Sequence, residues 1–186
     1  MNDIYLKFPS IEEKEEWINY VKETKIDNPE STPGGFKEDT KYEEWLSKKH
    51  DEYNNINLEE GRVPSSFYFL MDGNRIIGSI SIRHSIDSDM LKRFGGHIGY
   101  NIRPSERRKG FATKMLNLAL EKCEELGLEE VMVTCKENNI GSAKTIENNG
   151  GILKEIVYIP EENSNFKKYW INVKEALNKK DEKHKK

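Results

Sequence analysis

Hydrophobic and polar positions follow two rhythms along this chain, the two-residue repeat of a strand and the longer repeat of a helix. The strand repeat is clearest in residues 67–71 and 75–84, which flank the typical hairpin turn at residues 72–74. The helical repeat is clearest after residue 108, where apolar positions recur every three or four residues. The two rhythms predict where strands and helices alternate.

Read along the whole chain, these patterns predict seven strands and four helices. The predicted strands span residues 4–8, 67–71, 75–84, 97–103, 130–135, 152–159 and 166–173. The first predicted helix follows a capping box at Ser10 and Glu13. The other three predicted helices span residues 39–53, 108–126 and 139–149. Strand–helix–strand units predict parallel pairing in the middle, and hairpins predict antiparallel neighbours. An α/β fold with a mixed sheet and helices on both faces follows.

Length and composition favour one folded domain over residues 1–178, followed by a charged, disordered tail at 179–186. Charged residues make up 34% of the 186 residues, but the apolar residues are grouped in periodic blocks rather than scattered. The net charge of −3 argues against a nucleic-acid binder, which is usually basic. With no signal peptide and no apolar run long enough to cross a bilayer, we expect a cytoplasmic protein without membrane contact.

The two cysteines, Cys123 and Cys135, lie in a helical and a strand pattern. Neither belongs to a Cys-x-x-Cys motif or a Cys/His cluster, so no metal site is predicted. We expect two reduced, partly buried thiols.

The stretch most indicative of chemistry is 107–113, Arg-Arg-Lys-Gly-Phe-Ala-Thr, which follows a predicted strand and opens the long helix. A helix start offers backbone N–H groups that have no helical partner, together with the positive end of the helix dipole. A glycine there lets a ligand approach the backbone closely. The stretch therefore predicts a phosphate or pyrophosphate site.

Two common phosphate motifs are excluded. The stretch lacks the Gly-Lys-Ser/Thr ending of a P-loop, and it lacks the three glycines of a dinucleotide-binding fingerprint. A nucleotide hydrolase is therefore disfavoured. The context is more specific: a strand, Pro104, the Arg-x-x-Gly-x-Ala motif, a long helix, a strand, Asn139-x-x-Ser142 and a Gly-Gly turn.

In this block the chain resembles the GNAT superfamily of N-acetyltransferases, over about residues 67–173 with a cofactor core at 97–151. Residues 95–107 are similar to a subgroup of bacterial acetyltransferases. The resemblance implies a twisted sheet of about seven strands, splayed between two central parallel strands that hold acetyl-CoA. The residues that it assigns to this cosubstrate are Tyr100, Ile102, Arg103, Arg107, Arg108, Lys109, Gly110, Phe111, Ala112, Thr113, Asn139 and Ser142.

The chain departs from this family in its proton-transfer groups. Many members carry a tyrosine seven residues after the motif asparagine, where this chain has Ile146, and neither central strand contains an internal glutamate. The remaining catalytic candidates are His84, His97 and Tyr100, with the two histidines expected to approach each other across the hairpin. Cys135 is disfavoured as a nucleophile, because no neighbouring residue activates it.

We therefore predict an acetyl-CoA-dependent N-acetyltransferase in which a primary amine attacks the thioester directly. The acceptor is a small-molecule or peptide amine, and Asp87 and Asp89 in the loop 85–96 are candidates for attracting a cationic one. The alternative is a non-catalytic sensor or interaction module that binds CoA. The chain is also compatible with a homodimer.

Overall fold

A mixed sheet of seven strands is the centre of the computed structural model, which describes residues 3–37 and 39–184. The strand order is β1-β2-β3-β4-β5-β7-β6, and within the described residues only the β4–β5 pair is parallel. The strands are β1 (Ile4–Lys7), β2 (Ser65–Asp72), β3 (Arg75–Arg83), β4 (Ile98–Ile102), β5 (Glu130–Lys136), β6 (Ile152–Ile159) and β7 (Ser164–Asn172). The predicted mixed sheet with central parallel strands is therefore confirmed.

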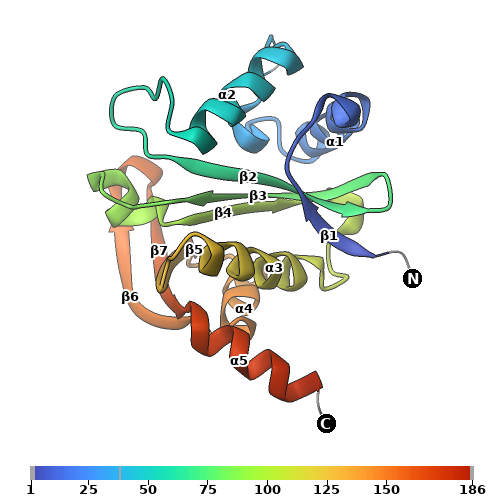
Figure 1. The fold of residues 1–186 in the computed structure, drawn as a ribbon. Coiled ribbons are helices and arrows are strands. Elements are labelled where there is room, and N and C mark those ends of the chain that lie inside the picture. The colour runs from blue at the N-terminus through green and yellow to red at the C-terminus, as the bar shows by residue number, and fades with distance from the viewer. Residues whose placement is uncertain (1–2, 38, 185–186) are drawn as a thin grey trace.

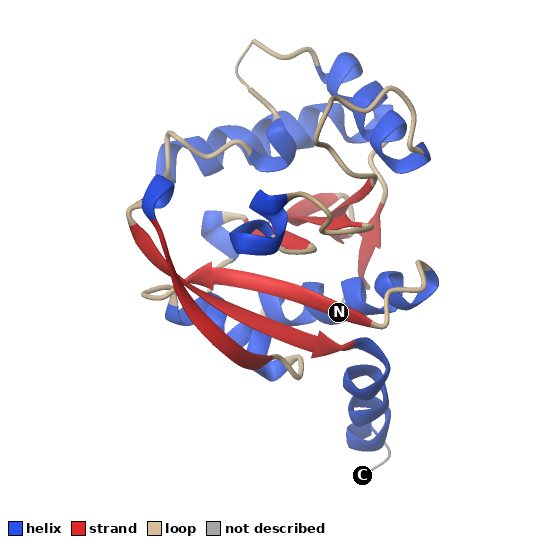
Figure 2. Ribbon diagram, turned by 90° about the vertical axis from the view of Figure 1, so that its left-hand side faces the viewer, coloured by secondary structure: helices blue, strands red, loops and turns tan. Residues whose placement is uncertain are grey.

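Helices cover both faces of this sheet, as predicted (Figure 1). On one face lie α1 (Lys14–Asp27) and α2 (Tyr42–Asn54). On the other face lie α3 (Phe111–Glu125), α4 (Ile140–Asn148) and α5 (Val173–His184). Figure 2 shows the same two helical layers above and below the strands, seen from the side of β6.

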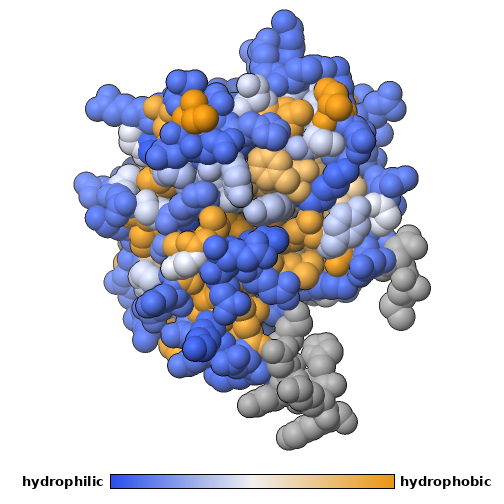
Figure 3. All heavy atoms as spheres, viewed as in Figure 1, coloured by the Kyte–Doolittle hydropathy of each residue, from blue (hydrophilic) through white to orange (hydrophobic). Residues whose placement is uncertain are grey.

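Each helical layer packs on its own hydrophobic core. The core under α1 and α2 is aromatic: the Trp17 ring stacks on Trp45 with 4.8 Å between centroids, and Phe67 and Phe69 from β2 complete it. The core under α3 is aliphatic and includes Ile80, which is fully buried. Most of the face shown in Figure 3 is hydrophilic. Burial of these apolar side chains is the main stabilising contribution.

Local sequence signals explain where α1 begins. The Ser10 hydroxyl accepts a hydrogen bond from the Glu12 N–H, and the Glu13 carboxylate accepts one from the Ser10 N–H at 3.0 Å. This is the predicted capping box, which satisfies donors that a helix start leaves free. The chain first forms a short 3₁₀ turn (Ile11–Glu13) and then continues as α1.

The β4–β5 pair is joined at one end only. Its ladder has a single residue pair, Ile98 with Val133, whereas β4 pairs with β3 over five residues and β5 with β7 over seven. One further bond, from the His97 N–H to the Met132 carbonyl at 2.8 Å, lies just before β4. Beyond Ile98 the two strands diverge, and the splay implied by the resemblance is present.

Two features of the fold differ from the predictions. Residues 173–184 form α5, so residues 179–184 of the expected tail are helical, and residues 185–186 lie outside the described residues. The predicted loop 85–96 contains a short π-helical turn (Leu91–Gly95). Neither segment has a strong apolar repeat of its own. Leu91 is buried, and the first turns of α5 pack on the aliphatic core through Ala176 and Leu177.

Gly96 controls the point where β4 and β5 meet. Its φ is +63°, and a Cβ there would lie 2.7 Å from the Met132 carbonyl oxygen. We predict that Gly96→Ala lowers the free energy of unfolding by at least about 2 kcal/mol, because it adds both backbone strain and a clash with main chain. The measurement is urea unfolding followed by circular dichroism.

Gly99→Ala is the matched control, because a Cβ at Gly99 has no atom within 4 Å and Gly99 does not have a positive φ. Its free energy of unfolding is expected to stay close to that of the wild type. Equal destabilisation by the two substitutions would contradict this account of the β4–β5 junction.

Candidate functional site

Two cavities lie on opposite faces of the sheet and meet at β4. The α3-side cavity has a volume of about 1080 Å³ and is lined by β4, β5, the start of α3 and the start of α4. The α1-side cavity has a volume of about 880 Å³ and is lined by the end of α1, the following loop, α2 and the strands β2 and β3. Six described residues line both cavities: Asp27, Asn28, Gly99, Tyr100, Asn101 and Arg107.

The start of α3 forms one wall of the α3-side cavity. Gly110 precedes the helix with a φ of +83°, and no atom lies within 4 Å of where its Cβ would be. Arg108 also has a positive φ, +64°, which is a strained conformation for a side chain of this size. Residues with alternating backbone conformations turn successive N–H groups toward one side and create an anion-binding concavity. With the dipole of α3 behind it, this wall has the chemistry that a pyrophosphate requires.

Ten of the twelve cofactor residues predicted from sequence line the α3-side cavity. They are Tyr100, Ile102, Arg107, Arg108, Gly110, Phe111, Ala112, Thr113, Asn139 and Ser142. Arg107 extends across the cavity rim, where its guanidinium donates to the Asp27 carboxylate at 2.7 Å and to the Ile102 carbonyl at 3.2 Å.

The other two, Arg103 and Lys109, line neither cavity. Lys109 is exposed and pairs with Glu106 at 2.9 Å. Arg103 is buried on the other face of the sheet, where it binds the carboxylates of Glu16 and Glu23 from α1 at 2.5 and 2.6 Å. Arg103 thus anchors α1 to the sheet, and its backbone rather than its side chain belongs to the end of β4.

A hydroxyl cluster connects β4 with α4. The Asn139 side chain caps α4 by accepting the Ser142 N–H at 3.0 Å, which fixes the first turn of the helix. The Ser142 hydroxyl then lies 2.7 Å from the Tyr100 hydroxyl and shares a hydrogen bond with it. Burial raises the pKa of Tyr100 to about 12, so the group is a phenol rather than a phenolate near neutral pH.

Cys135 lies in the same wall but is not an activated thiol. Its side chain is buried and burial raises its pKa, opposed by a hydrogen bond with Ser142. Cys123 is fully buried within the aliphatic core, and burial raises its pKa to about 12. Both are free cysteines, and neither has the lowered pKa of a nucleophile.

The two candidate histidines line neither cavity, and their rings contact different strands. The His84 ring nitrogen Nε2 lies 2.8 Å from the Ser66 hydroxyl on β2. His97 Nδ1 accepts the Met132 N–H from β5 at 2.9 Å, so its ring proton is on Nε2. The expected convergence of the two rings is therefore not observed. His97 instead helps to fasten β4 to β5 at their joined end.

Ile146, where the resemblance implies a tyrosine in many family members, is fully buried in the aliphatic core. Asp87 and Asp89 line neither cavity. Among the described residues, no group of three or more His, Cys, Asp or Glu side chains is arranged to hold a metal ion. None of the described helices combines the length and apolar character needed to cross a membrane.

Sequence reasoning missed the α1-side cavity and the side chains that β3 contributes to it. Ser79, Ser81 and Arg83 occupy alternate positions of β3 and line this cavity, on the face opposite Ile80 and Ile82. Their alternation was visible in the sequence, but it equally describes a strand with one solvent-exposed face. Only the position of α1 and α2 over this face encloses it.

Comparison with known proteins agrees with the geometry. Residues 6–152 match the model of the acetyltransferase (GNAT) domain. No curated protein matches the chain in sequence.

Several solved structures share the fold at low sequence identity. The microcin C7 self-immunity acetyltransferase MccE, in complex with acetyl-CoA and AMP, is 18% identical with a TM-score of 0.67, over 91% of this chain and 92% of that one. RimJ from Mycobacterium smegmatis, in complex with CoA-disulfide, is 13% identical with a TM-score of 0.68, over 94% and 90%. A chimera of the spermidine N-acetyltransferase SpeG from Vibrio cholerae and hSSAT is 18% identical with a TM-score of 0.59, over 94% and 98%.

The bond between His97 and Met132 generates a pH prediction. Burial, and secondarily the charge of Arg83, lowers the pKa of His97 below its ordinary value of 6.5, opposed by Asp87. Below about pH 6.5 His97 is protonated in the unfolded chain but stays neutral in the folded protein. The free energy of unfolding of the wild type therefore falls as the pH drops through this range. We expect His97→Asn, whose amide oxygen stands at the same number of bonds from the backbone as Nδ1 and can accept the Met132 N–H, to show a shallower fall. The measurement is urea unfolding between about pH 7 and pH 5.5.

His97→Ala is the companion variant, because it leaves the Met132 N–H without a partner. Its free energy of unfolding is expected to fall by about 1–3 kcal/mol at neutral pH. His84, whose pKa burial also lowers, is present in all three proteins and contributes equally to each slope. Identical pH slopes for the wild type and His97→Asn would show that His97 is not the titrating group.

Proposed function

This chain belongs to the GNAT acetyltransferase family, and we propose that it transfers the acetyl group of acetyl-CoA to a primary amine. The observation that carries the proposal is the meeting of the two cavities at Gly99–Asn101 of β4, beside the splay between β4 and β5. A donor bound on the α3 side and an acceptor bound on the α1 side would meet at this point. Holding two reactants in contact is itself a large contribution to catalysis.

In this proposal the α3-side cavity holds acetyl-CoA. The pyrophosphate lies against the backbone of residues 107–113 at the start of α3, where N–H groups and the helix dipole favour an anion. The pantetheine arm lies along β4, whose backbone groups beyond Ile98 have no partner on β5. An extended ligand that bonds to these groups acts as a partial extra strand. Thr134 and Cys135 line the opposite side.

The reaction is a direct attack of the amine nitrogen on the thioester carbonyl carbon. The C–N bond forms, the C–S bond breaks, and the amine proton leaves through water in the α1-side cavity, since neither histidine lines that cavity. A backbone N–H of the splayed strand polarises the carbonyl. The departing sulfur takes a proton from the hydroxyl of Tyr100, a residue that lines both cavities, and the phenolate regains a proton from solvent through Ser142.

Tyr100 takes the place of the missing family tyrosine in this scheme. The usual position, Ile146, is on α4, and Tyr100 reaches the same helix from β4 through its bond to Ser142. Because its pKa is raised to about 12, Tyr100 is a phenol near neutral pH, so its hydroxyl is available as a donor when negative charge develops on the departing sulfur.

The buried Ile146 favours one alternative, a module that binds CoA without transferring its acetyl group. Release of free CoA in the presence of a panel of primary amines separates the two functions. Turnover above the rate of thioester hydrolysis supports the transferase. Acetyl-CoA binding without turnover across the panel supports the binding module.

Gly110 tests the position of the pyrophosphate. We predict that Gly110→Glu weakens acetyl-CoA binding at least about 100-fold, because it places a carboxylate where the pyrophosphate binds. Gly110→Ala is the matched control, since it introduces the same strain at a φ of +83° without a charge. Its loss of affinity is expected to be several-fold smaller. Isothermal titration calorimetry measures both, and equal affinities for the two variants would contradict this position.

Tyr100 tests the proton donor. We predict that Tyr100→Phe lowers kcat about 100-fold while the Kd for acetyl-CoA stays within about threefold, because the hydroxyl acts only as the thiolate leaves. Tyr158→Phe is the control, since this exposed tyrosine bonds to Asn163 and lines neither cavity. Steady-state kinetics with an amine from the panel provide the measurement. A Tyr100→Phe enzyme with wild-type kcat would exclude the phenol from the mechanism.

A further inference from the structure

The α1-side cavity has a positively charged wall. Among the described residues that line it, six side chains are cationic and three are anionic. The six are Lys37, Lys48, Lys49, Arg62, Arg83 and Arg107. The whole chain has a net charge of −3, so this local excess of positive charge is opposite in sign to that of the chain.

Four of these six cations are already paired with carboxylates of the cavity, and one of them, Arg62, lies 3.6 Å from Glu59. Lys48 pairs with Glu59, and Lys49 with Glu52, at 2.7 Å in each case. Arg107 pairs with Asp27, also at 2.7 Å. The three carboxylates are therefore occupied, and none of them forms an ion pair with Arg83.

Arg83 is a half-buried guanidinium without a carboxylate partner among the described residues. Its Nη1 donates to the carbonyl oxygens of Gly95 and Gly96 at 3.1 and 3.0 Å. A guanidinium has five N–H donors, so Nε and Nη2 remain for another acceptor. Burial lowers the pKa of Arg83, which reflects the cost of holding this charge away from water. A ligand anion would offset that cost.

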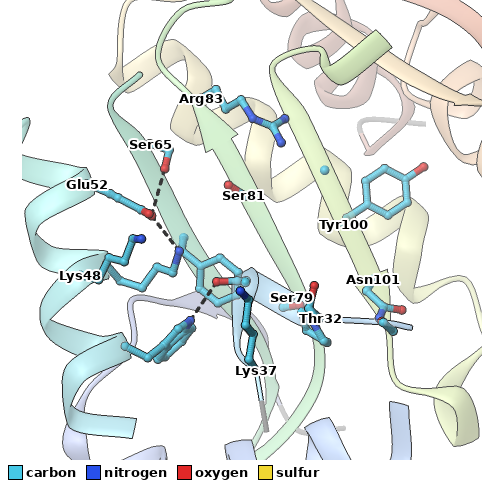
Figure 4. Close-up of a pocket in the computed structure, with 18 of the residues that line it drawn as sticks. Thr32, Lys37, Lys48, Glu52, Ser65, Ser79, Ser81, Arg83, Tyr100 and Asn101 are labelled. Carbon is cyan, nitrogen blue, oxygen red and sulfur yellow. Dashed lines mark hydrogen bonds and ion pairs between the residues drawn. The ribbon is translucent and has the colours of Figure 1, made fainter. Parts of the chain in front are cut away.

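The position of Arg83 relates it to the point where the two cavities meet. Ser79, Ser81 and Arg83 lie in a row along β3, with Tyr100 and Asn101 on the neighbouring strand β4 (Figure 4). Ser81 pairs in register with Gly99, and Arg83 lies two residues further along β3. At about 3.4 Å per residue, Arg83 is about 7 Å along the strand from the meeting point.

We infer that the acceptor of this enzyme is an amine that also carries an anionic group, a carboxylate or a phosphate, which binds Arg83. This inference rests on the proposed function and names the substrate class of its acceptor cavity. The planar guanidinium presents paired N–H donors that match two oxygens of such a group, and the Ser81 hydroxyl beside it offers another donor. A polycationic amine would place a second positive charge beside Arg83 and is disfavoured.

Matched amines that differ only in the anion test the inference. The first pair is 6-aminohexanoate with hexylamine, and it tests a carboxylate. The second pair is 4-aminobutyl phosphate with butylamine, and it tests a phosphate. Binding to the protein saturated with CoA is measured by calorimetry, and kcat/KM is measured with acetyl-CoA. We expect the anionic member of at least one pair to bind about tenfold more tightly than its uncharged-tail partner.

Arg83→Gln is expected to reduce this preference to less than about threefold while the affinity for acetyl-CoA is unchanged. Arg93→Gln is the matched control, because this exposed arginine pairs with Glu161 and lines neither cavity. Ser81→Asp is a second variant that leaves the bonds from Arg83 to Gly95 and Gly96 intact. The introduced carboxylate forms an ion pair with the Arg83 guanidinium. The variant should therefore lose binding of the anionic amine and keep binding of the amine without the anion.

The binding measurement judges the inference whether or not the protein turns over. If the wild type binds both members of each pair equally, or if Arg83→Gln weakens both members equally, the inference is overturned. If the anionic amine binds selectively but no acetyl group is transferred, the proposed function fails and the anion site stands.

Discussion

An incomplete strand pairing is the constraint on which the rest of this structure depends. β4 and β5 are held together at one end by the His97–Met132 backbone bond, the His97 ring and the Ile98–Val133 register pair, and they separate beyond it. Backbone N–H and C=O groups in the middle of a sheet need partners, and here no strand supplies them. A parallel pair that closes fully would leave no opening through the sheet, so the two cavities would not meet.

The two faces of the opening have different chemistry because different elements build them. On the α3 face a helix start and a positive-φ turn concentrate N–H groups, which suits the phosphates of a nucleotide cosubstrate. On the α1 face the wall is made of hydroxyl and cationic side chains from β3 and α2. Arg103 sets the position of this second wall, because its buried ion pairs with Glu16 and Glu23 fix α1 against the sheet. Desolvation raises the pKa of Glu23, but the hydrogen bonds that it accepts from Arg103 and Ser105 outweigh this effect and lower the pKa to about 2.

Features that depend on local sequence were the ones that could be predicted. The capping box at Ser10 and the helix start after Gly110 each involve residues only a few positions apart, so their spacing is diagnostic. The roles of His97 and Arg103 could not be predicted, because their partners lie on other elements: Met132 is 35 residues from His97, and Glu23 is 80 residues from Arg103. A histidine at a strand end has the same neighbours in sequence whether its ring is a catalytic base or accepts a hydrogen bond from a backbone N–H.

The anion-binding part of the proposed cosubstrate site was therefore predictable from the sequence alone. Residues 107–113 form a contiguous strand-to-helix connection, and a helix start binds anions through its own backbone wherever it lies in the fold. The cavity proposed for the acceptor was decided only by the tertiary structure. Its wall combines the end of α1, part of α2, alternate residues of β3 and the middle of β4. These side chains are distant in sequence, and they form one cavity only because long-range packing places α1 and α2 over the sheet.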